Sequence, residues 1–328
     1  MARPTPTFAH RVSPAKVWAA LGSVYIVWGT TYLAIRITNE TLPPLIAAGV
    51  RFLIAGSALY AFSIRRGDVE GDRPTRANWI AAGIVGAGLV AGGNGSVVLA
   101  EVTVPSGIVS LILALIPLWM ALLDRMVFRN RVGWVTAFGI VLGFGGAALL
   151  IGGTALDQGA PLSGMLLALL ATLSWSGASL YSRGAPLPAR PLLGAGMEMI
   201  VGGAILVLGG LLRGELALVQ LDAFSLRSLL ALGYLITFGS WVGFASYVWL
   251  LRSARTSLVS TYAYVNPVVA VFLGWLILDE TVTLRTVGAG AIILVAVAII
   301  ISAGGTGRRE EPVRVEVEEE PQPLPEPA

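Results

Sequence analysis

The chain contains no cysteine and a single histidine, His10. Without thiols it can form no disulfide, thiolate metal site or cysteine nucleophile, and one histidine supplies neither a metal centre nor a catalytic triad. Charge is also scarce, because Asp, Glu, Lys and Arg make up only 12% of the 328 residues. The arginines form no stripe of the kind that binds nucleic acid. We therefore expect no cofactor, no metal, no nucleic acid and no enzymatic activity.

Apolar residues dominate what remains. They make up 55% of the chain, and the mean hydropathy of +0.79 exceeds what a soluble domain carries. Many apolar runs reach the ~20 residues with which a helix crosses ~30 Å of hydrocarbon. The sequence predicts an all-α membrane protein with ten transmembrane helices, at residues 17–36, 43–64, 77–99, 106–128, 132–151, 161–181, 191–212, 228–250, 257–278 and 284–303.

Basic residues are distributed unevenly around these spans. If the N-terminus is cytoplasmic, the basic residues outside the cytoplasmic segments are only five of the 22: Arg36, Arg51, Arg213, Arg227 and Arg285. The positive-inside rule thus favours ten spans with both termini in the cytoplasm. Residues 1–15 are too polar for a signal peptide and indicate a cytoplasmic leader. Residues 306–328 are acidic and Pro-rich, which predicts a disordered cytoplasmic tail.

The chain contains an internal repeat. A shift of 147 residues aligns Trp28 with Trp175, Arg36 with Arg183 and Pro44 with Pro191, and a shift of 150 aligns Pro117 with Pro267. We infer two five-helix repeats, at residues 16–155 and 156–305. Five crossings per repeat make the second repeat insert upside down, which is the inverted-repeat plan of secondary transporters. Two such bundles can alternate between inward-open and outward-open shapes around a site near the bilayer midplane.

Several stretches resemble a known family. "VWGTTYLAIRI", "LPPLIAAGVRFLIAG" and "YAYVNPVVAVFLGWLILDETVT" are similar to the first, second and ninth helices of EamA-type members of the drug/metabolite transporter superfamily, and other segments resemble the YedA-like exporters. The resemblance implies ten helices in two inverted EamA repeats, in a bacterial inner membrane, and export of amino acids or other small metabolites. One departure is Asn130, which stands where an acidic residue would match Glu280 of the second repeat.

Polar and kinking residues interrupt the ninth span. Pro117 and Pro267 occupy equivalent interior positions of spans four and nine, where proline removes a backbone hydrogen bond and bends the helix. These kinks are either structural or part of a gating site. Tyr262 and Asn266 lie one turn apart on one face. An amide in hydrocarbon needs a partner, which is either a neighbouring helix or a polar cavity.

Aromatic and polar residues also lie deep in other spans. Trp28 and Tyr32 share a face of the first span, and Trp175 and Ser179 share a face of the sixth. These aromatic residues are either interfacial anchors or walls of a substrate cavity. Asn94 lies among glycines in the third span and is a further candidate for contact with substrate.

Three charges fall in or near the spans. Arg51 and Glu198 are equivalent in the two repeats, and intramembrane charge is costly enough to indicate function. Each lies about seven residues into its helix but from opposite membrane sides, so we expect their depths to differ by ~10 Å. They either anchor the structure or serve gating and proton transfer. Glu101, at the outer end of the third span, is either a solvated carboxylate or a proton-coupling group.

These features favour a secondary transporter that exports small metabolites such as amino acids by alternating access, as a monomer or weak homodimer. Proton-coupled multidrug efflux is the alternative within transport. A lipid-modifying enzyme would require histidine or clustered carboxylates at the interface, and neither occurs. A passive channel would differ by showing unsaturable flux.

Overall fold

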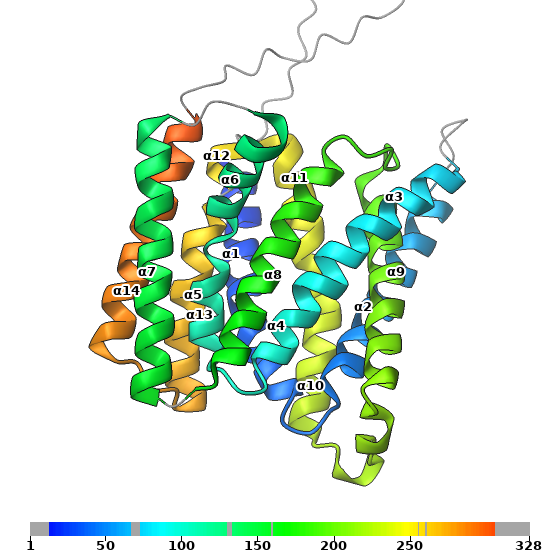
Figure 1. Cartoon of the computed structure of the whole chain (residues 1–328). Coiled ribbons are helices and arrows are strands. Elements are labelled where there is room, and N and C mark those ends of the chain that lie inside the picture. Colours follow the sequence, from blue (N-terminus) through cyan, green and yellow to red (C-terminus); the bar gives the residue numbers. More distant parts are fainter. Residues whose placement is uncertain are drawn as a thin grey trace, which may run out of the picture.

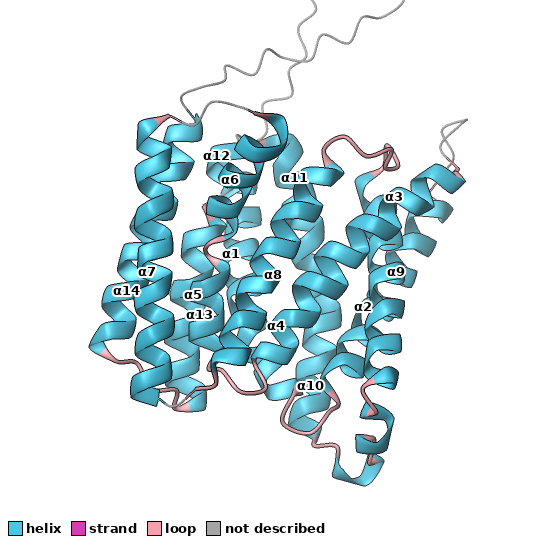
Figure 2. Cartoon of the chain, viewed as in Figure 1, coloured by secondary structure: helices cyan, strands magenta, loops and turns pink. Residues whose placement is uncertain are grey.

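The computed structural model of the chain describes residues 13–66, 73–129, 133–158, 160–254, 256–259 and 261–305. Most of the expected leader, the expected tail and Asn130 lie outside these ranges. Throughout the described residues the regular elements are helices joined by short loops, as Figure 2 shows. The prediction of an all-α fold is therefore confirmed.

Six of the expected spans are single helices. They are α1 (Pro14–Thr38), α2 (Pro44–Arg65), α7 (Trp134–Gln158), α8 (Leu162–Ser182), α9 (Pro191–Leu212) and α14 (Leu284–Gly305). Figure 1 shows α7 and α14 side by side at one edge of the bundle and α2 and α9 together at the other. Their apolar surfaces suit a lipid environment, and exposed residues such as Leu212 and Trp134 are 81% and 80% accessible.

The other four spans are interrupted, among them the fourth and ninth, where the prolines predict kinks. The third consists of α3 (Arg76–Gly86), the π-helix η1 (Ala87–Asn94) and α4 (Gly95–Ala100). The eighth repeats this order in α10 (Leu226–Tyr234), the π-helix η4 (Leu235–Val242) and α11 (Gly243–Ser253). The fourth is divided into α5 (Ser106–Leu113) and α6 (Ile116–Phe128), and the ninth into α12 (Thr256–Val259) and α13 (Tyr262–Leu278). Two short 3₁₀ turns, η2 (Glu215–Leu218) and η3 (Leu221–Ala223), follow α9.

The break in the fourth span has a local cause. Pro117 lies in the first turn of α6, and its ring would clash with the carbonyl of Leu113, the last residue of α5. The equivalent Pro267 lies inside α13, whose first residue is Tyr262. The two prolines therefore act at different points of their spans. Even so, nine of the described stretches are long and apolar enough to cross a membrane, and α13 is a shorter apolar helix.

Helix pairing follows the internal repeat. The first span packs against the ninth (α1 with α13), and the sixth packs against the fourth (α8 with α5 and α6). Likewise α1 packs against α10, η4 and α11, while α8 packs against η1 and α4. Each contact is reproduced when the two halves are exchanged. An odd number of spans per half then makes the two halves inverted relative to each other.

The second and seventh spans approach closely at glycines. A methyl group on Gly49 would lie 2.8 Å from the Gly203 carbonyl oxygen, and one on Gly56 would lie 2.8 Å from the Gly196 carbonyl oxygen. Small residues at such crossings let two helix backbones touch, which is the usual way membrane helices associate. The two contacts lie seven residues apart on each helix, so α2 and α9 touch at two successive points along the crossing.

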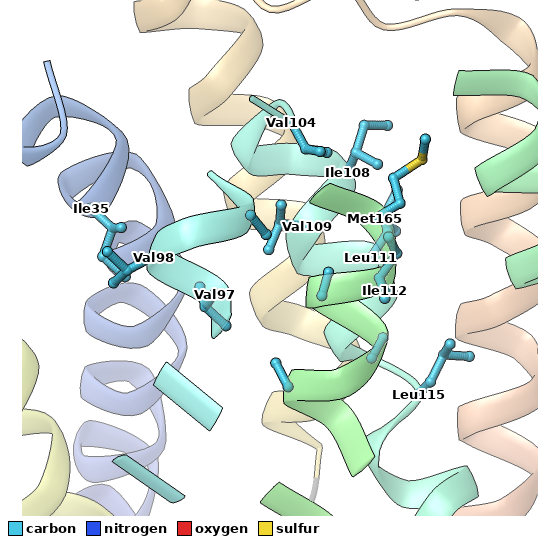
Figure 3. Close-up of a cluster of buried hydrophobic side chains, with 14 of the residues drawn as sticks. Ile35, Val97, Val98, Val104, Ile108, Val109, Leu111, Ile112, Leu115 and Met165 are labelled. Atoms are coloured by element: carbon cyan, nitrogen blue, oxygen red, sulfur yellow. The ribbon is translucent and has the colours of Figure 1, made fainter. Parts of the chain in front are cut away.

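The largest hydrophobic cluster joins helices of the first half to α8, α9, η4 and α14 of the second. Figure 3 shows part of it, with Val97 and Val98 of α4 beside Ile35 of α1, and Ile108 and Ile112 of α5 near Met165 of α8. Ile112 and Met165 are fully buried. Within a membrane this packing contributes mainly through close van der Waals contact, because lipid is as apolar as the side chains. The cluster supports one side of the central cavity.

Candidate functional site

A cavity lies between the two halves, where α1, α2 and η1 of the first meet α8, α9, η4 and α13 of the second. Its empty space, including space open to solvent, is about 1020 Å³. Six residues predicted as substrate-binding line it, together with both of the predicted intramembrane charges inside spans: Trp28, Tyr32, Asn94, Trp175, Tyr262, Asn266, Arg51 and Glu198. The fold thus gathers in one place residues from six separate spans.

Aromatic rings form one wall of the cavity. The ring centroids of Trp28 and Tyr262 are 5.3 Å apart at an interplanar angle of 85°, an edge-to-face arrangement. Tyr247 of α11 completes the group, with its centroid 5.1 Å from that of Trp28. The Trp28 indole donates a hydrogen bond of 3.3 Å to the Gly239 carbonyl. Rings held in this way present a rigid apolar surface to a ligand.

The π-helices place polar groups at the cavity. In a π-helix each carbonyl bonds five residues ahead, which widens the helix and is common at functional sites. The Asn94 amide donates to the Leu89 carbonyl at 3.3 Å, and the Ser240 hydroxyl donates to the Leu235 carbonyl at 3.1 Å. Both bonds run from residue i to residue i−5. Asn94 and Ser240 therefore stabilise equivalent π-helices, η1 and η4, on the two sides of the cavity.

Asn266 carries an unsatisfied acceptor at the cavity wall. The residue is 5% exposed, and its side-chain oxygen has no hydrogen-bond partner within the described part of the chain. A buried amide oxygen left unpaired costs about 1–3 kcal/mol. A ligand or water molecule that donates a hydrogen bond at this point would recover that cost.

The Arg51 guanidinium is held on one side. Its Nε donates a hydrogen bond of 3.1 Å to the Ser240 hydroxyl, and its Cζ lies 4.6 Å from the centre of the Phe52 ring. The residue is 5% exposed. Hydrogen bonding and the ring face therefore fix the orientation of this cation where it borders the cavity.

Arg51 and Glu198 reach the cavity from neighbouring helices, α2 and α9, which pack tightly against each other. The expected difference of ~10 Å between their depths stays a prediction.

Four predicted residues do not line the cavity. Ser179 lies one turn beyond Trp175, and the backbone carbonyl of Ser179 accepts a bond of 2.8 Å from Ser182. Pro117 lies in the first turn of α6 and Pro267 inside α13. Glu101 lies at the end of α4, directly after the apolar stretch Arg76–Ala100.

Glu101 belongs to a separate polar cluster at the end of the bundle where α5 begins. Its carboxylate is fully buried, neither oxygen has a partner among the described residues, and its backbone carbonyl accepts a bond from Arg36. Burial first, and the nearby Glu280 carboxylate second, raise the pKa of Glu101 well above its ordinary 4.5, while Arg36 opposes the shift. The expected solvated carboxylate is therefore buried.

Two other carboxylates bind helix N-termini on this side. Glu280 accepts hydrogen bonds from the backbone amides of Ser106 at 2.7 Å and Gly107 at 3.0 Å, at the start of α5. Glu215 accepts them from Leu45 at 2.9 Å and Ile46 at 3.1 Å, at the start of α2. Negative charge at a helix N-terminus is stabilising because it meets unpaired amides and the positive end of the dipole. Glu280 thereby ties the end of α13 to the start of α5.

Sequence reasoning missed several residues of the cavity. Ser240, Gly239, Phe52 and Phe244 line it, and Tyr247 supports its aromatic wall. Ser240 was detectable, because a shift of 146 residues aligns Gly93 and Asn94 with Gly239 and Ser240. Phe52 and Phe244 show no pattern that separates them from the other apolar residues of their spans.

The model of the EamA-like transporter family matches residues 15–152 and 162–302. The "Uncharacterized inner membrane transporter YedA" of Escherichia coli (strain K12) is 38% identical over 84% of this chain and 88% of its own length. A "Probable amino-acid metabolite efflux pump" of the same strain is 25% identical over 82% of this chain and 90% of its own. A crystal structure of another protein superposes on this chain with a TM-score of 0.60 and 19% sequence identity. The superposition covers 90% of this chain and 100% of the other chain, which shows that the two share a fold.

Proposed function

The chain belongs to the EamA-like transporter family, and on that premise we propose that it exports small metabolites, amino acids among them, from the cytoplasm by alternating access. It is a multi-pass membrane transporter. The observation that carries the finer proposal is the cavity at the interface of the two halves, where aromatic rings, amides and both intramembrane charges meet. The name of the efflux-pump relative supports amino acids as a substrate class.

In this mechanism the two halves rock against each other around the cavity. Residues 16–155 and 156–305 form the two repeats, and the tightly packed α2 and α9 lie at their interface. Pro117 and Pro267 provide the kinks at which helix ends swing. Trp28, Tyr32, Trp175 and Tyr262 contact the apolar part of the substrate, and Asn94 and Asn266 its polar part.

Export from the cytoplasm across a bacterial inner membrane requires a defined topology. We propose that both termini are cytoplasmic, with the protein acting as a monomer or weak homodimer. Because the chain has no native cysteine, single cysteines introduced near either terminus can be labelled without background. Labelling of either one by an impermeant maleimide in intact cells would contradict this topology.

Uptake into proteoliposomes tests the transport proposal. The purified protein should move at least one amino acid or related metabolite from a broad panel faster than empty vesicles, with saturable kinetics. Asn266→Ala and Trp175→Ala should lower the transport rate while leaving expression and monodispersity unchanged. Trp275→Ala is the matched control, because Trp275 is 54% exposed and away from the cavity. No movement of any panel member would refute the function, and unaltered kinetics in both cavity variants would refute the site.

Proton-coupled multidrug efflux is the second candidate, and the position of Glu198 favours it. The carboxylate is half-buried and borders the cavity, where it could exchange a proton for a cationic drug. This function predicts that hydrophobic cations drive proton release from proteoliposomes and that Glu198→Gln abolishes the coupling. Amino-acid flux without such proton release would exclude it.

A further inference from the structure

The cavity contains one positive and one negative side chain that do not pair with each other. Arg51 and Glu198 both line it, yet no ion pair between them occurs in the described structure. Arg51 has a hydrogen bond only from its Nε, to Ser240. Neither Nη group of Arg51 and neither carboxylate oxygen of Glu198 has a hydrogen bond to another described residue.

Unpaired charges at this depth need partners. A charged group in a membrane protein pairs with another charge, binds backbone carbonyls or faces water or a ligand, because its desolvation is otherwise costly. The Arg51 guanidinium could not simply turn away, since Ser240 holds its Nε and Gly239 lies beneath Nη2, only 3.2 Å from where a methyl group on that glycine would be. Its free N–H groups are thus fixed at the cavity boundary.

We propose that Arg51 and Glu198 bind the two ends of a zwitterion, the substrate carboxylate and the substrate ammonium respectively. The proposal rests on the export function above and specifies its substrate class as a free α-amino acid with an apolar or aromatic side chain. Arg51 suits a carboxylate because its planar group offers two parallel N–H donors. Glu198 supplies the negative charge that an ammonium requires.

The surroundings of the two charges match the rest of such a molecule. Arg51 and Glu198 border the same cavity from the neighbouring helices α2 and α9, so both side chains can reach a ligand whose two charged groups sit on one carbon. Trp28 and Tyr262 offer perpendicular rings at a centroid distance of 5.3 Å, an apolar surface for the side chain. The unpaired oxygen of Asn266 can accept a further N–H bond from the ammonium.

Competition binding with three related compounds tests the assignment. Purified protein in detergent is loaded with radiolabelled L-phenylalanine, and displacement is measured with unlabelled L-phenylalanine, 2-phenylethylamine, which lacks the carboxylate, and 3-phenylpropionate, which lacks the ammonium. Wild-type protein should prefer the zwitterion at least tenfold over either analogue, because each analogue leaves one charge of the site without its partner.

Variants of Arg51 and Glu198 test separately which residue binds the substrate carboxylate and which binds the ammonium. Where a variant no longer binds labelled L-phenylalanine, inhibition of proteoliposome transport by the same three compounds is measured instead. Arg51→Gln should abolish the preference for L-phenylalanine over 2-phenylethylamine and leave its preference over 3-phenylpropionate. Glu198→Gln should do the opposite, and Arg51→Lys should keep part of the preference. Glu40→Gln, which alters an exposed carboxylate on the outer face, should leave all three affinities unchanged.

Three results would overturn the assignment. They are equal wild-type affinity for the three compounds, equal losses for all three compounds in Arg51→Gln or Glu198→Gln, and no binding of any of them. The metabolite panel separates this failure from failure of the function, because saturable transport of a metabolite without two opposite charges would preserve export while refuting zwitterion recognition.

Discussion

The link between Glu280 and the start of α5 allows a quantitative prediction. The carboxylate accepts two backbone N–H bonds, at 2.7 and 3.0 Å, from Ser106 and Gly107. Ser106 is fully buried, so Glu280→Ala leaves amides that water reaches only partly. A hydrogen bond to a charged group contributes about 1.5–3 kcal/mol. Because Glu280 is itself partly exposed, we expect the free energy of unfolding to fall by about 2–4 kcal/mol.

A second variant separates charge from hydrogen bonding. Glu280→Gln retains a neutral acceptor that can hold one amide, and a neutral bond contributes about 0.5–1.5 kcal/mol. The free energy of unfolding should therefore fall about half as much in Glu280→Gln as in Glu280→Ala. Glu40→Gln is the control, because Glu40 pairs with Arg227 at 3.6 Å in an exposed ion pair, with side chains 37% and 53% accessible. Such pairs contribute about 0–1 kcal/mol.

Equilibrium unfolding by SDS in mixed micelles, followed by tryptophan fluorescence, measures all three variants on one scale. The order of destabilisation should be Glu280→Ala, then Glu280→Gln, then Glu40→Gln. If Glu280→Ala were no more destabilising than Glu40→Gln, the carboxylate would not be what holds the end of α13 to α5. The role assigned to the acidic turn after the ninth span would then be wrong.

Two further predictions concern Glu101 and the contact between α3 and α9. Because the pKa of Glu101 is raised, the folded protein holds the proton of this carboxyl group more firmly than the unfolded chain does. The stability that this group contributes is therefore fully present below about pH 4.5 and is lost as the pH rises through the folded-state pKa. Glu101→Gln should flatten the dependence of melting temperature on pH, and an unchanged slope would count against burial of the carboxylate. A methyl group on Gly86 would lie 2.2 Å from the Glu198 carbonyl oxygen, so Gly86→Ala should destabilise by about 1–3 kcal/mol. Gly83→Ala, whose added group would lie 3.6 Å from Val201, should not, and equal effects would refute the close contact.

Hydropathy and charge were sufficient to predict the number and order of the spans. The apolar runs predicted all ten spans, of which six are single helices. They could not predict η1 and η4, because the residues of both π-helices are mostly apolar, like those of the α-helices that flank them.

The candidate site was predictable where a polar or aromatic residue stands out against an apolar span. Trp28, Trp175 and Asn266 were found in this way, and each borders the cavity. Ser179 followed the same reasoning but lies one turn too far along α8, because a shared helix face does not define depth. The partner of Glu280 could not be inferred, since the bond joins residues more than 170 positions apart.

The roles proposed for Arg51 and Glu198 would explain how a symmetric fold binds a substrate in one orientation. Two inverted halves produce equivalent π-helices and equivalent backbone positions on both sides of the cavity. A site with identical side chains at those positions would hold a ligand equally well in two opposite orientations. Opposite charges at one equivalent pair remove that degeneracy for any ligand with a positive and a negative end, because the reversed orientation brings like charges together. In this proposal the repeated backbone serves alternation between the two membrane sides, while the unequal side chains at positions 51 and 198 select the substrate.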